Sequence, residues 1–290
     1  MKEKKKNIRI TTDGVCDLPF GMLEENDIDI IFFHIITENG RFNDRDEMTA
    51  DNVFEHMDGG GFKAEAECPS TEEYIEFFRK NLRTHDRIVH IAMSGRIGDA
   101  YKNAVEATRT MGFSGEKVTV IDSETISAGM GLLVMHGSDM IKAGKDASDI
   151  YLELERLKKR IVTSLIAPDA YYFYLNDKVG LTLVKIIELF QIRPVLKIKE
   201  GKVKFSYFLM GPFQNAIKRY IKYQLGRKSR VSKKRIFLIH SACNVKTLQM
   251  AKKEIEYSGN YEEIVVTKAS ATVSTYCGPN TLAVLYMKNK

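Results

Sequence analysis

The sequence predicts an α/β protein built from two α/β domains, the first of them with a mostly parallel sheet flanked by helices. The chain has 290 residues, 44% apolar and 28% charged, which is enough for two hydrophobic cores. Strand-like and helix-like segments alternate through the first half, as they do in parallel sheets with helical crossovers. The pattern shifts at Ala167-Pro168-Asp169, where the proline favours a boundary.

The first domain opens with a strand at Ile8–Thr11. Asp27–Ile36 is a nearly continuous run of isoleucine and phenylalanine, so we expect a strand buried on both faces at the centre of the sheet. Ser70-Thr71-Glu72-Glu73 forms a capping box, because Ser70 can accept from the Glu73 backbone while the Glu73 side chain reaches back. A helix through Leu82 is therefore predicted.

Two strand–loop–helix units follow. Arg87–Ala92 is a strand, Ser94–Gly98 is a tight loop, and an apolar helical pattern begins at Ala100. Val118–Ser123 repeats the arrangement and leads into a helix whose small residues, from Ala128 to Gly131, permit close packing on the sheet. These units predict the parallel part of the fold.

A charged helix over Asp149–Val162 is expected to close the first domain, and we place the domain junction at residue 168. The first domain then covers residues 1–168 and the second, basic one covers 169–290. The second domain carries the elements of a further α/β layer: a strand at Pro194–Ile198, a turn at Glu200-Gly201, a return strand from Lys202, a helix from about Phe213, a strand at Arg235–Ile239, and a last helix and strands.

The sequence predicts a cytoplasmic protein with reduced thiols and no metal site. The basic start, Met1–Lys6, runs directly into a strand without the apolar core of a secretory signal. No stretch approaches the roughly 18 to 20 apolar residues that span a bilayer. The four cysteines are scattered without zinc-ligand spacing, at Cys16, Cys68, Cys243 and Cys277.

Charge is distributed unevenly along the chain. Residues 1–170 carry 22 Lys and Arg against 31 Asp and Glu, whereas residues 171–290 carry 22 against 7. Between Gly201 and Lys253 there are 14 basic residues and no acidic one. This bias favours an anionic partner, such as an acidic protein or a membrane surface, although a solvated face would have the same composition. No nucleic-acid-binding motif accompanies it, so nucleic acid is not expected.

The Ser94-Gly95-Arg96-Ile97-Gly98 loop is the first candidate site. It joins a strand to a helix, so backbone N–H groups and the positive end of the helix dipole are expected to converge there and bind an anion. The loop lacks the glycine patterns of dinucleotide and nucleoside triphosphate sites, which favours a small head group such as a carboxylate. A plain glycine-rich turn is the alternative interpretation.

Other candidates have a simpler structural interpretation. Asp13 and Asp17, in the loop after the first strand, could serve acid–base or metal chemistry, but can equally cap turns. Ser94 lies outside the nucleophile-elbow pattern, and His90 alternates within a strand, which favours a structural role. Cys277 would be a nucleophile only if its pKa were lowered, and no neighbour in the sequence does so.

Several short motifs, taken together and in order, resemble the DegV-like family of fatty-acid-binding proteins. Thr11–Pro19 resembles the family's opening T-D-S-x-x-D-L-P, and Ala66–Ser70 falls where the family has T-S-Q-P-S. Ser94–Gly98 resembles its S-G-L-S-G. The remaining matches are Val120–Ser123 to V-I-D-S, Gly129–Leu132 to M-G-x-G, Arg193–Leu196 to K-P-I-L, and Tyr276–Leu282 to H-T-G-P-G-A-L.

The resemblance implies two α/β domains with a ligand tunnel between them, no catalytic residues and no cofactor. The ligand would be a long-chain fatty acid, presented by the protein to a separate fatty acid kinase. The resemblance implies that the carboxylate lies near Ser94. The implied ligand-binding residues are Ser94, Gly95, Ala66, Cys68, Tyr276, Cys277 and Gly278.

Three polar positions depart from the family pattern. Ala66 replaces a threonine, Tyr276 replaces a histidine, and the segment around Lys178-Val179-Gly180 replaces G-G-R. The ligand is then held by Ser94, Tyr276 and backbone, or it differs from a simple fatty acid. Glu67 would also lie near this pocket by the same comparison. A regulatory or scaffold protein that has lost the ligand, and an acyl hydrolase using Ser94 or Cys277, remain the alternatives.

Overall fold

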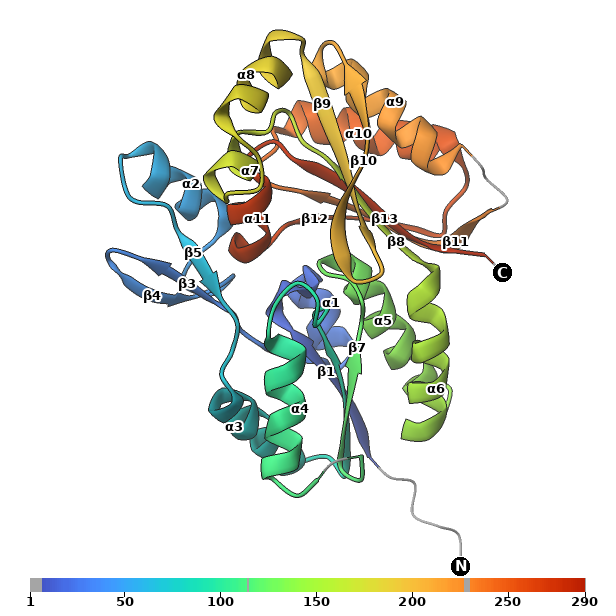
Figure 1. The fold of residues 1–290 in the computed structure, drawn as a ribbon. Coiled ribbons are helices and arrows are strands. Elements are labelled where there is room, and N and C mark those ends of the chain that lie inside the picture. The colour runs from blue at the N-terminus through green and yellow to red at the C-terminus, as the bar shows by residue number, and fades with distance from the viewer. Residues whose placement is uncertain (1–6, 114, 227–229, 290) are drawn as a thin grey trace, which may run out of the picture. The chain divides into compact units, whose positions relative to one another are not determined.

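The computed structural model describes residues 7–113, 115–226 and 230–289, so the basic segment Met1–Lys6 lies outside the described residues. The chain forms two compact units, each assembled from separate segments (Figure 1). Unit 1 comprises the chain up to Phe33, Cys68–Arg160 and Glu200–Lys202. Unit 2 comprises His34–Glu67, Ile161–Lys199 and the chain from Val203 onward.

Unit 1 contains a four-stranded parallel sheet in the order β2-β1-β6-β7, which confirms the predicted α/β class. Its strands are β1 (Ile8–Asp13), β2 (Asp29–Ile31), β6 (Arg87–Ala92) and β7 (Val118–Asp122). Its helices are α1 (Phe20–Glu25), α3 (Thr71–Leu82), α4 (Ala100–Thr110), α5 (Ala128–Lys142) and α6 (Ala147–Leu157), with short 3₁₀ turns at Gly14–Cys16 and Lys158–Arg160. Helix α3 packs against α4, and α5 packs against α6. The inner strands β1 and β6 are buried from Ile10 and from Ile88 onward, although both carry polar residues.

Local sequence signals set several of these elements. The capping box at α3 is present: the Glu73 amide donates to Ser70 Oγ at 3.2 Å, and the Ser70 amide donates to Glu73 Oε2 at 2.7 Å. A methyl group at Gly131 of α5 would come within 3.0 Å of the Cys16 carbonyl oxygen. The small residues of α5 therefore allow close packing, as predicted.

Unit 2 contains a six-stranded mixed sheet in the order β10-β9-β8-β13-β11-β12. Its strands are β8 (Ile161–Ile166), β9 (Ile192–Lys199), β10 (Lys202–Met210), β11 (Val231–His240), β12 (Glu263–Lys268) and β13 (Leu282–Lys288). Strands β11 and β12 run parallel, whereas β13 runs antiparallel to both β11 and β8. Helices α9 (Phe213–Leu225) and α10 (Val245–Ser258) pack against each other.

A smaller antiparallel sheet in the order β4-β3-β5 also belongs to unit 2. It consists of β3 (His34–Thr37), β4 (Gly40–Asn43) and β5 (Glu65–Glu67). Three further helices of this unit are α2 (Ala50–Asp58), α7 (Tyr171–Leu175) and α8 (Leu181–Leu189). The short helix α11 (Ala271–Cys277) contacts α2, α7, β3 and β5.

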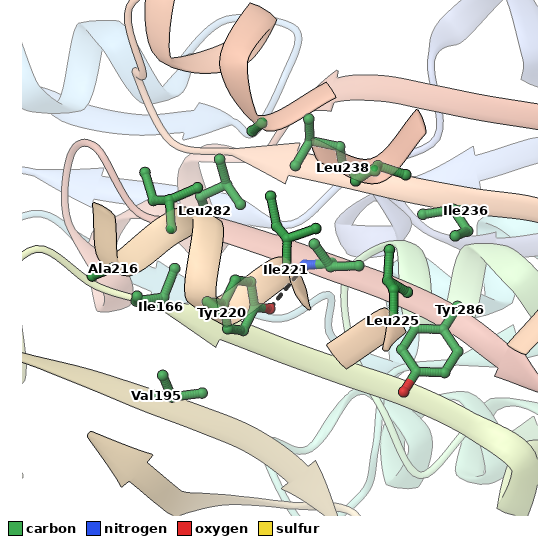
Figure 2. Close-up of a cluster of buried hydrophobic side chains, with 14 of the residues drawn as sticks. Ile166, Val195, Ala216, Tyr220, Ile221, Leu225, Ile236, Leu238, Leu282 and Tyr286 are labelled. Atoms are coloured by element: carbon green, nitrogen blue, oxygen red, sulfur yellow. Dashed lines mark hydrogen bonds between the residues drawn. The ribbon is translucent and has the colours of Figure 1, made fainter. Parts of the chain in front are cut away.

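Tyr220 of α9 places a hydroxyl group inside the hydrophobic core of unit 2, as Figure 2 shows. The hydroxyl donates to the Ser164 carbonyl oxygen at 2.6 Å and accepts from the Val284 amide at 3.1 Å. Ser164 and Val284 are cross-strand partners in β8 and β13. A side chain thus bridges the backbone of two neighbouring strands and satisfies polar groups that would otherwise be buried without partners.

Two sequence predictions of elements are wrong. The expected single central strand over Asp27–Ile36 is divided: β2 is the edge strand of the parallel sheet, and β3 belongs to the small sheet of unit 2. Phe33, in the link between the two strands, is only 2% exposed. The apolar run is therefore explained by burial of the link as well as of the two strands. The helix expected over Asp149–Val162 ends at Leu157, because β8 begins at Ile161.

The compact units also differ in extent from the predicted halves 1–168 and 169–290. His34–Glu67 groups with unit 2, and Glu200–Lys202 groups with unit 1. The grouping of these segments depends on contacts between residues far apart in the chain, which short-range sequence patterns do not indicate. The division of the chain into domains at residue 168 stays a prediction.

Candidate functional site

Ser94 lies two residues after the end of the buried strand β6 in unit 1 and has no solvent exposure. Its hydroxyl donates to the Gly201 carbonyl oxygen at 2.8 Å and accepts from the Arg96 amide at 3.3 Å. Its own amide donates to the Thr125 carbonyl oxygen at 2.9 Å. The side chain is therefore fixed in position before any ligand is considered.

The loop amides do not form the open anion site that the sequence predicts. The Ile97 and Gly98 amides donate to the Ser94 carbonyl oxygen at 2.9 and 3.4 Å, and the Gly95 amide lies 3.4 Å from Asp122 Oδ1. Helix α4 begins only at Ala100, so the loop closes as a turn of its own and uses these donors internally. The amides of Gly95, Arg96, Ile97 and Gly98 therefore all have partners within the protein.

A buried carboxylate lies behind the loop. Asp13, at the end of β1, has no solvent exposure, and its Oδ2 accepts from the Met93 amide at 2.7 Å. Its Oδ1 accepts from the Tyr74 hydroxyl at 2.6 Å. Burial raises the pKa of Tyr74 well above its usual value, so the phenol stays protonated and remains a donor. Asp13 thus fixes the backbone immediately before Ser94.

His90 completes this network. Its Nε2 lies 3.2 Å from Asp13 Oδ1, and its Nδ1 lies 3.0 Å from Thr11 Oγ1. The ring is fully buried and makes edge contacts with Tyr74 and Phe78. The predicted structural role of His90 is confirmed. Its pairing with Asp13 was missed, because neither the 77-residue separation nor the local pattern marks it.

Asp17, the second carboxylate of the same loop, also has a structural role. Its backbone is left-handed at φ 52°, and its Oδ2 accepts from the Ser127 hydroxyl at 2.5 Å. Ser127 directly precedes α5. The contact ties the loop after β1 to the start of that helix, in agreement with the interpretation that these aspartates organise turns.

Cys68 belongs to unit 1, beside Pro69. Asn103 of α4 donates to the Pro69 carbonyl oxygen at 2.8 Å, and its Nδ2 lies 3.8 Å from the Cys68 sulfur. Burial raises the pKa of the Cys68 thiol, to which the nearby carboxylates of Asp99 and Asp13 contribute. The thiol is therefore protonated near neutral pH and is a weak nucleophile.

The other predicted ligand-binding residues lie in unit 2, where the structure brings them together. Ala66 pairs with Ile35 in the small sheet and packs on a core shared by α2 and α11. The last turn of α11 carries Tyr276, which is 47% exposed, and Cys277, which is 8% exposed. Helix α11 packs directly against β5, the strand that holds Ala66. Glu67 on the same strand accepts from Arg41 Nε at 2.8 Å.

Gly278 is required by a close approach of Tyr172. The glycine has a left-handed backbone at φ +78°, and a Cβ there would lie 2.5 Å from the Tyr172 ring. Burial raises the pKa of Tyr172 to about 12, and its ring meets Phe54 edge-on at 5.7 Å. The sequence analysis does not identify Tyr172 as a candidate residue. Its position shortly before the Lys178–Gly180 segment, where the chain departs from the family pattern, could have indicated it.

A second buried carboxylate, Asp44, positions α11. It is 1% exposed, and it accepts from the Ala271 and Thr272 amides at 2.7 and 2.9 Å. Burial raises the pKa of Asp44 in spite of these donors, which lower it. This contact is not predictable from local sequence patterns, because Asp44 lies 227 residues before Ala271.

No helix among the described residues is long and apolar enough to cross a membrane. Within residues 7–113, 115–226 and 230–289 no group of three acidic, histidine or cysteine side chains is arranged to hold a metal ion. The fold and the candidate residues define an α/β protein with a parallel sheet in one unit and a mixed sheet in the other, in which a buried serine follows a parallel strand.

The chain belongs to the DegV family, whose model, described as "Uncharacterised protein, DegV family", matches residues 7–289. A DegV domain-containing protein of Staphylococcus aureus is 24% identical over 216 residues, which cover 74% of this chain and 75% of that protein. The structure is similar to a DegV family protein from Thermus thermophilus described by its fatty acid binding, with a TM-score of 0.87 and 21% identity over 98% of this chain and all of that one.

Bacillus subtilis DegV, described as a fatty acid binding protein, has a TM-score of 0.79 and 17% identity, and the match covers 98% of this chain and all of that one. A Thermotoga maritima protein, described as revealing fatty acid binding function, has a TM-score of 0.81 and 19% identity over 98% and 100% of the two chains. At these identities the similarity establishes the fold.

Proposed function

We propose that the protein is a carrier that binds a long-chain fatty acid or a similar lipid, with the carboxylate beside Ser94. The observation that carries the proposal is the buried Ser94 hydroxyl at the end of β6, at the serine of the family's S-G-L-S-G motif. Family relatives described as fatty-acid-binding proteins support the ligand class. Each buried CH₂ contributes about 0.8 kcal/mol, so the tail supplies most of the affinity and the hydroxyl orients the head group.

The remaining ligand contacts are proposed on the same basis. Ala66 offers only a methyl group and packs in an apolar cluster, so it would line the site without bonding the carboxylate. Tyr276, which is 47% exposed as a residue, offers a phenol in place of the family's histidine. The proposed ligand-binding residues are Ser94, Gly95, Ala66, Cys68, Tyr276, Cys277 and Gly278.

A non-enzymatic role fits the chemistry of these residues. The proton of the Ser94 hydroxyl is donated to a backbone carbonyl, which is no general base. The raised pKa of Cys68 keeps that thiol protonated, and Cys277 is nearly buried. An acyl hydrolase would need an activated nucleophile, so turnover of acyl esters that disappears in Ser94→Ala or Cys277→Ala would refute the carrier assignment.

We further propose that a cytoplasmic partner, such as a fatty acid kinase, receives the bound acid. The basic stretch 201–253 supports an acidic docking partner, and its Lys233 and Lys234 are exposed on β11. Recovery of a purified kinase by the protein should fall on Lys233→Glu with Lys234→Glu. Unchanged recovery would exclude this stretch as the docking site. Recovery that is independent of bound lipid would favour the alternative of a regulatory or scaffold protein.

Transient contact with a membrane surface is part of the same proposal. Helix α8 leaves apolar side chains in solvent, among them Leu183, Ile186 and Leu189, the last of which is 77% exposed. Strand β10 of the same unit exposes Phe205 and Phe208. Exposed apolar groups combined with lysines are typical of surfaces that rest on anionic lipid.

The direct test is identification of the ligand. Native mass spectrometry of gently purified protein should find a co-purified acid, and Ser94→Ala should reduce its occupancy and weaken the affinity for oleate. Ser138→Ala is the matched control, because Ser138 is another buried serine of unit 1 and its hydroxyl donates to Asn26 at 3.3 Å, outside the candidate loop. Wild-type protein that is empty and fails to bind added oleate would refute the proposal.

A further inference from the structure

The turn between β9 and β10 uses the hydroxyl that the proposed ligand needs. Ser94 Oγ donates to the Gly201 carbonyl oxygen at 2.8 Å, and Arg96 Nη1 donates to the Glu200 carbonyl oxygen at 3.1 Å. Glu200–Lys202 accordingly forms part of unit 1, although the strands on either side of it belong to unit 2. Two donors of one loop therefore serve two consecutive backbone oxygens.

A carboxylate presents the same chemistry as this pair of carbonyl groups. It has two adjacent oxygens, accepts hydrogen bonds only, and binds most strongly to donors such as a hydroxyl and a guanidinium. A serine hydroxyl has a single proton, so Ser94 cannot donate to the Gly201 carbonyl and to a ligand at once. Occupation of one acceptor excludes the other.

We infer that the Glu200-Gly201 turn is an intramolecular competitor for the carboxylate site, and that Arg96 is a second donor to the bound carboxylate. The inference rests on the proposed function. When an acid binds, its oxygens replace the two turn carbonyls on Ser94 and Arg96, and the turn is released from the loop. Arg96 stands where the family motif S-G-L-S-G has leucine, so the cation is a departure from that motif.

The backbone of the turn explains why a glycine is needed for this contact. Gly201 has φ +73° and Glu200 has φ 54°, both in the left-handed region. A Cβ at Gly201 would lie 2.6 Å from Ser94 Oγ and 3.3 Å from Arg96 Cδ. Because Ser94 is fully buried, the side chain at 201 would displace either the turn or the hydroxyl, and the Ser94–Gly201 hydrogen bond would break in both cases.

The substitution Gly201→Ala therefore tests whether the turn competes with the ligand for Ser94 or helps to form the ligand site. Removing the competing contact should tighten oleate binding roughly tenfold. The reason is that the apparent affinity is the intrinsic affinity multiplied by the fraction of protein in which the Ser94–Gly201 contact is open. Gly211→Ala is the matched control: Gly211 has φ +96°, ends the same hairpin, and a Cβ there meets nothing within 4 Å. It introduces similar backbone strain without touching Ser94, and should leave the affinity unchanged.

In the wild type, Arg96→Met removes a donor to the carboxylate and also removes the hydrogen bond that holds the competing turn, so the two effects oppose each other. In the Gly201→Ala background only the loss of the donor counts, so Arg96→Met should weaken oleate binding more there than in the wild type. Affinity is measured by displacement of cis-parinaric acid. In wild-type protein, hydrogen exchange of a peptide covering residues 199–204 should accelerate on addition of oleate, and this measurement does not require Gly201→Ala to fold.

The outcomes separate the two proposals. Wild-type protein that binds neither oleate nor cis-parinaric acid refutes the proposed function itself. If the wild type binds and Gly201→Ala binds equally or more weakly than Gly211→Ala, the turn is not a competitor and the inference fails. If exchange at residues 199–204 is unchanged or slower with oleate, the turn is not released and the inference also fails.

Discussion

Replacing Tyr220 by phenylalanine removes one oxygen atom from the core of unit 2 and leaves the ring in place. The hydroxyl lies between the Ser164 carbonyl oxygen at 2.6 Å and the Val284 amide at 3.1 Å, and the side chain has no solvent exposure. Burial raises the pKa of Tyr220, so the group is a neutral donor at ordinary pH. Its loss leaves one buried donor and one buried acceptor without their partner.

Each of these two groups costs about 1–3 kcal/mol, so we expect Tyr220→Phe to lower the free energy of unfolding by roughly 2–6 kcal/mol. At roughly 2–4 °C per kcal/mol for a large domain, this loss gives a fall in melting temperature of about 4–24 °C. Urea and thermal unfolding followed by circular dichroism measure the change. Tyr257→Phe is the control, since Tyr257 is 79% exposed on α10 and should show no difference.

The reasoning would be refuted by a loss below about 0.5 kcal/mol. Such a result would mean that β8 and β13 close directly through a Val284–Ser164 hydrogen bond, so that the tyrosine merely replaces a bond that the strands can make alone. The bridge would then contribute little to the stability of the sheet.

Three further predictions concern the site, the surface and pH. Asp13→Asn should weaken oleate binding at least several-fold and lower the free energy of unfolding, because the Asp13 carboxylate accepts a hydrogen bond from the Met93 amide just before Ser94. Unchanged affinity in the folded variant would show that oleate binding does not need this hydrogen bond. Leu189→Asp should reduce sedimentation with anionic vesicles while Tyr257→Asp does not, and equal losses would exclude α8 as the contact. The folded pKa of Tyr172 is about 12, above the usual value of 10, so its contribution to stability is complete below pH 10 and is lost as the pH rises toward 12. Between pH 10 and 12 the free energy of unfolding should therefore fall less in Tyr172→Phe than in the wild type. Identical pH profiles of the two proteins would contradict this.

The parallel sheet of unit 1 was predictable because its signals are local. Arg87–Ala92 is a short, mainly β-branched and apolar run, and the capping box at Ser70 specifies where α3 begins. The division of Asp27–Ile36 between two sheets was not predictable in this way. Apolar content indicates burial, whereas the choice of partner strand depends on residues elsewhere in the chain: Asp29 pairs with Thr11, and His34 pairs with Glu67.

The candidate site was predictable only where a motif carried it. Ser94 could be named from the sequence, but its hydrogen-bond partner could not, because Gly201 lies 107 residues further along the chain. The expectation of free loop amides failed for a related reason. A strand–loop–helix pattern places amides near a helix start, but whether they remain open depends on how the loop folds back, and here the Ser94 carbonyl oxygen accepts from both Ile97 and Gly98.

In each unit, a buried carboxylate fixes the backbone next to a candidate ligand segment. Asp13 receives the Met93 amide one residue before Ser94, and Asp44 receives the Ala271 and Thr272 amides at the start of the helix that ends in Tyr276 and Cys277. A buried charge is costly unless several donors satisfy it, and each of these aspartates accepts from two donors inside the protein. The two aspartates therefore hold their segments in position within each unit, which on the proposed function would lower the conformational cost of binding the ligand.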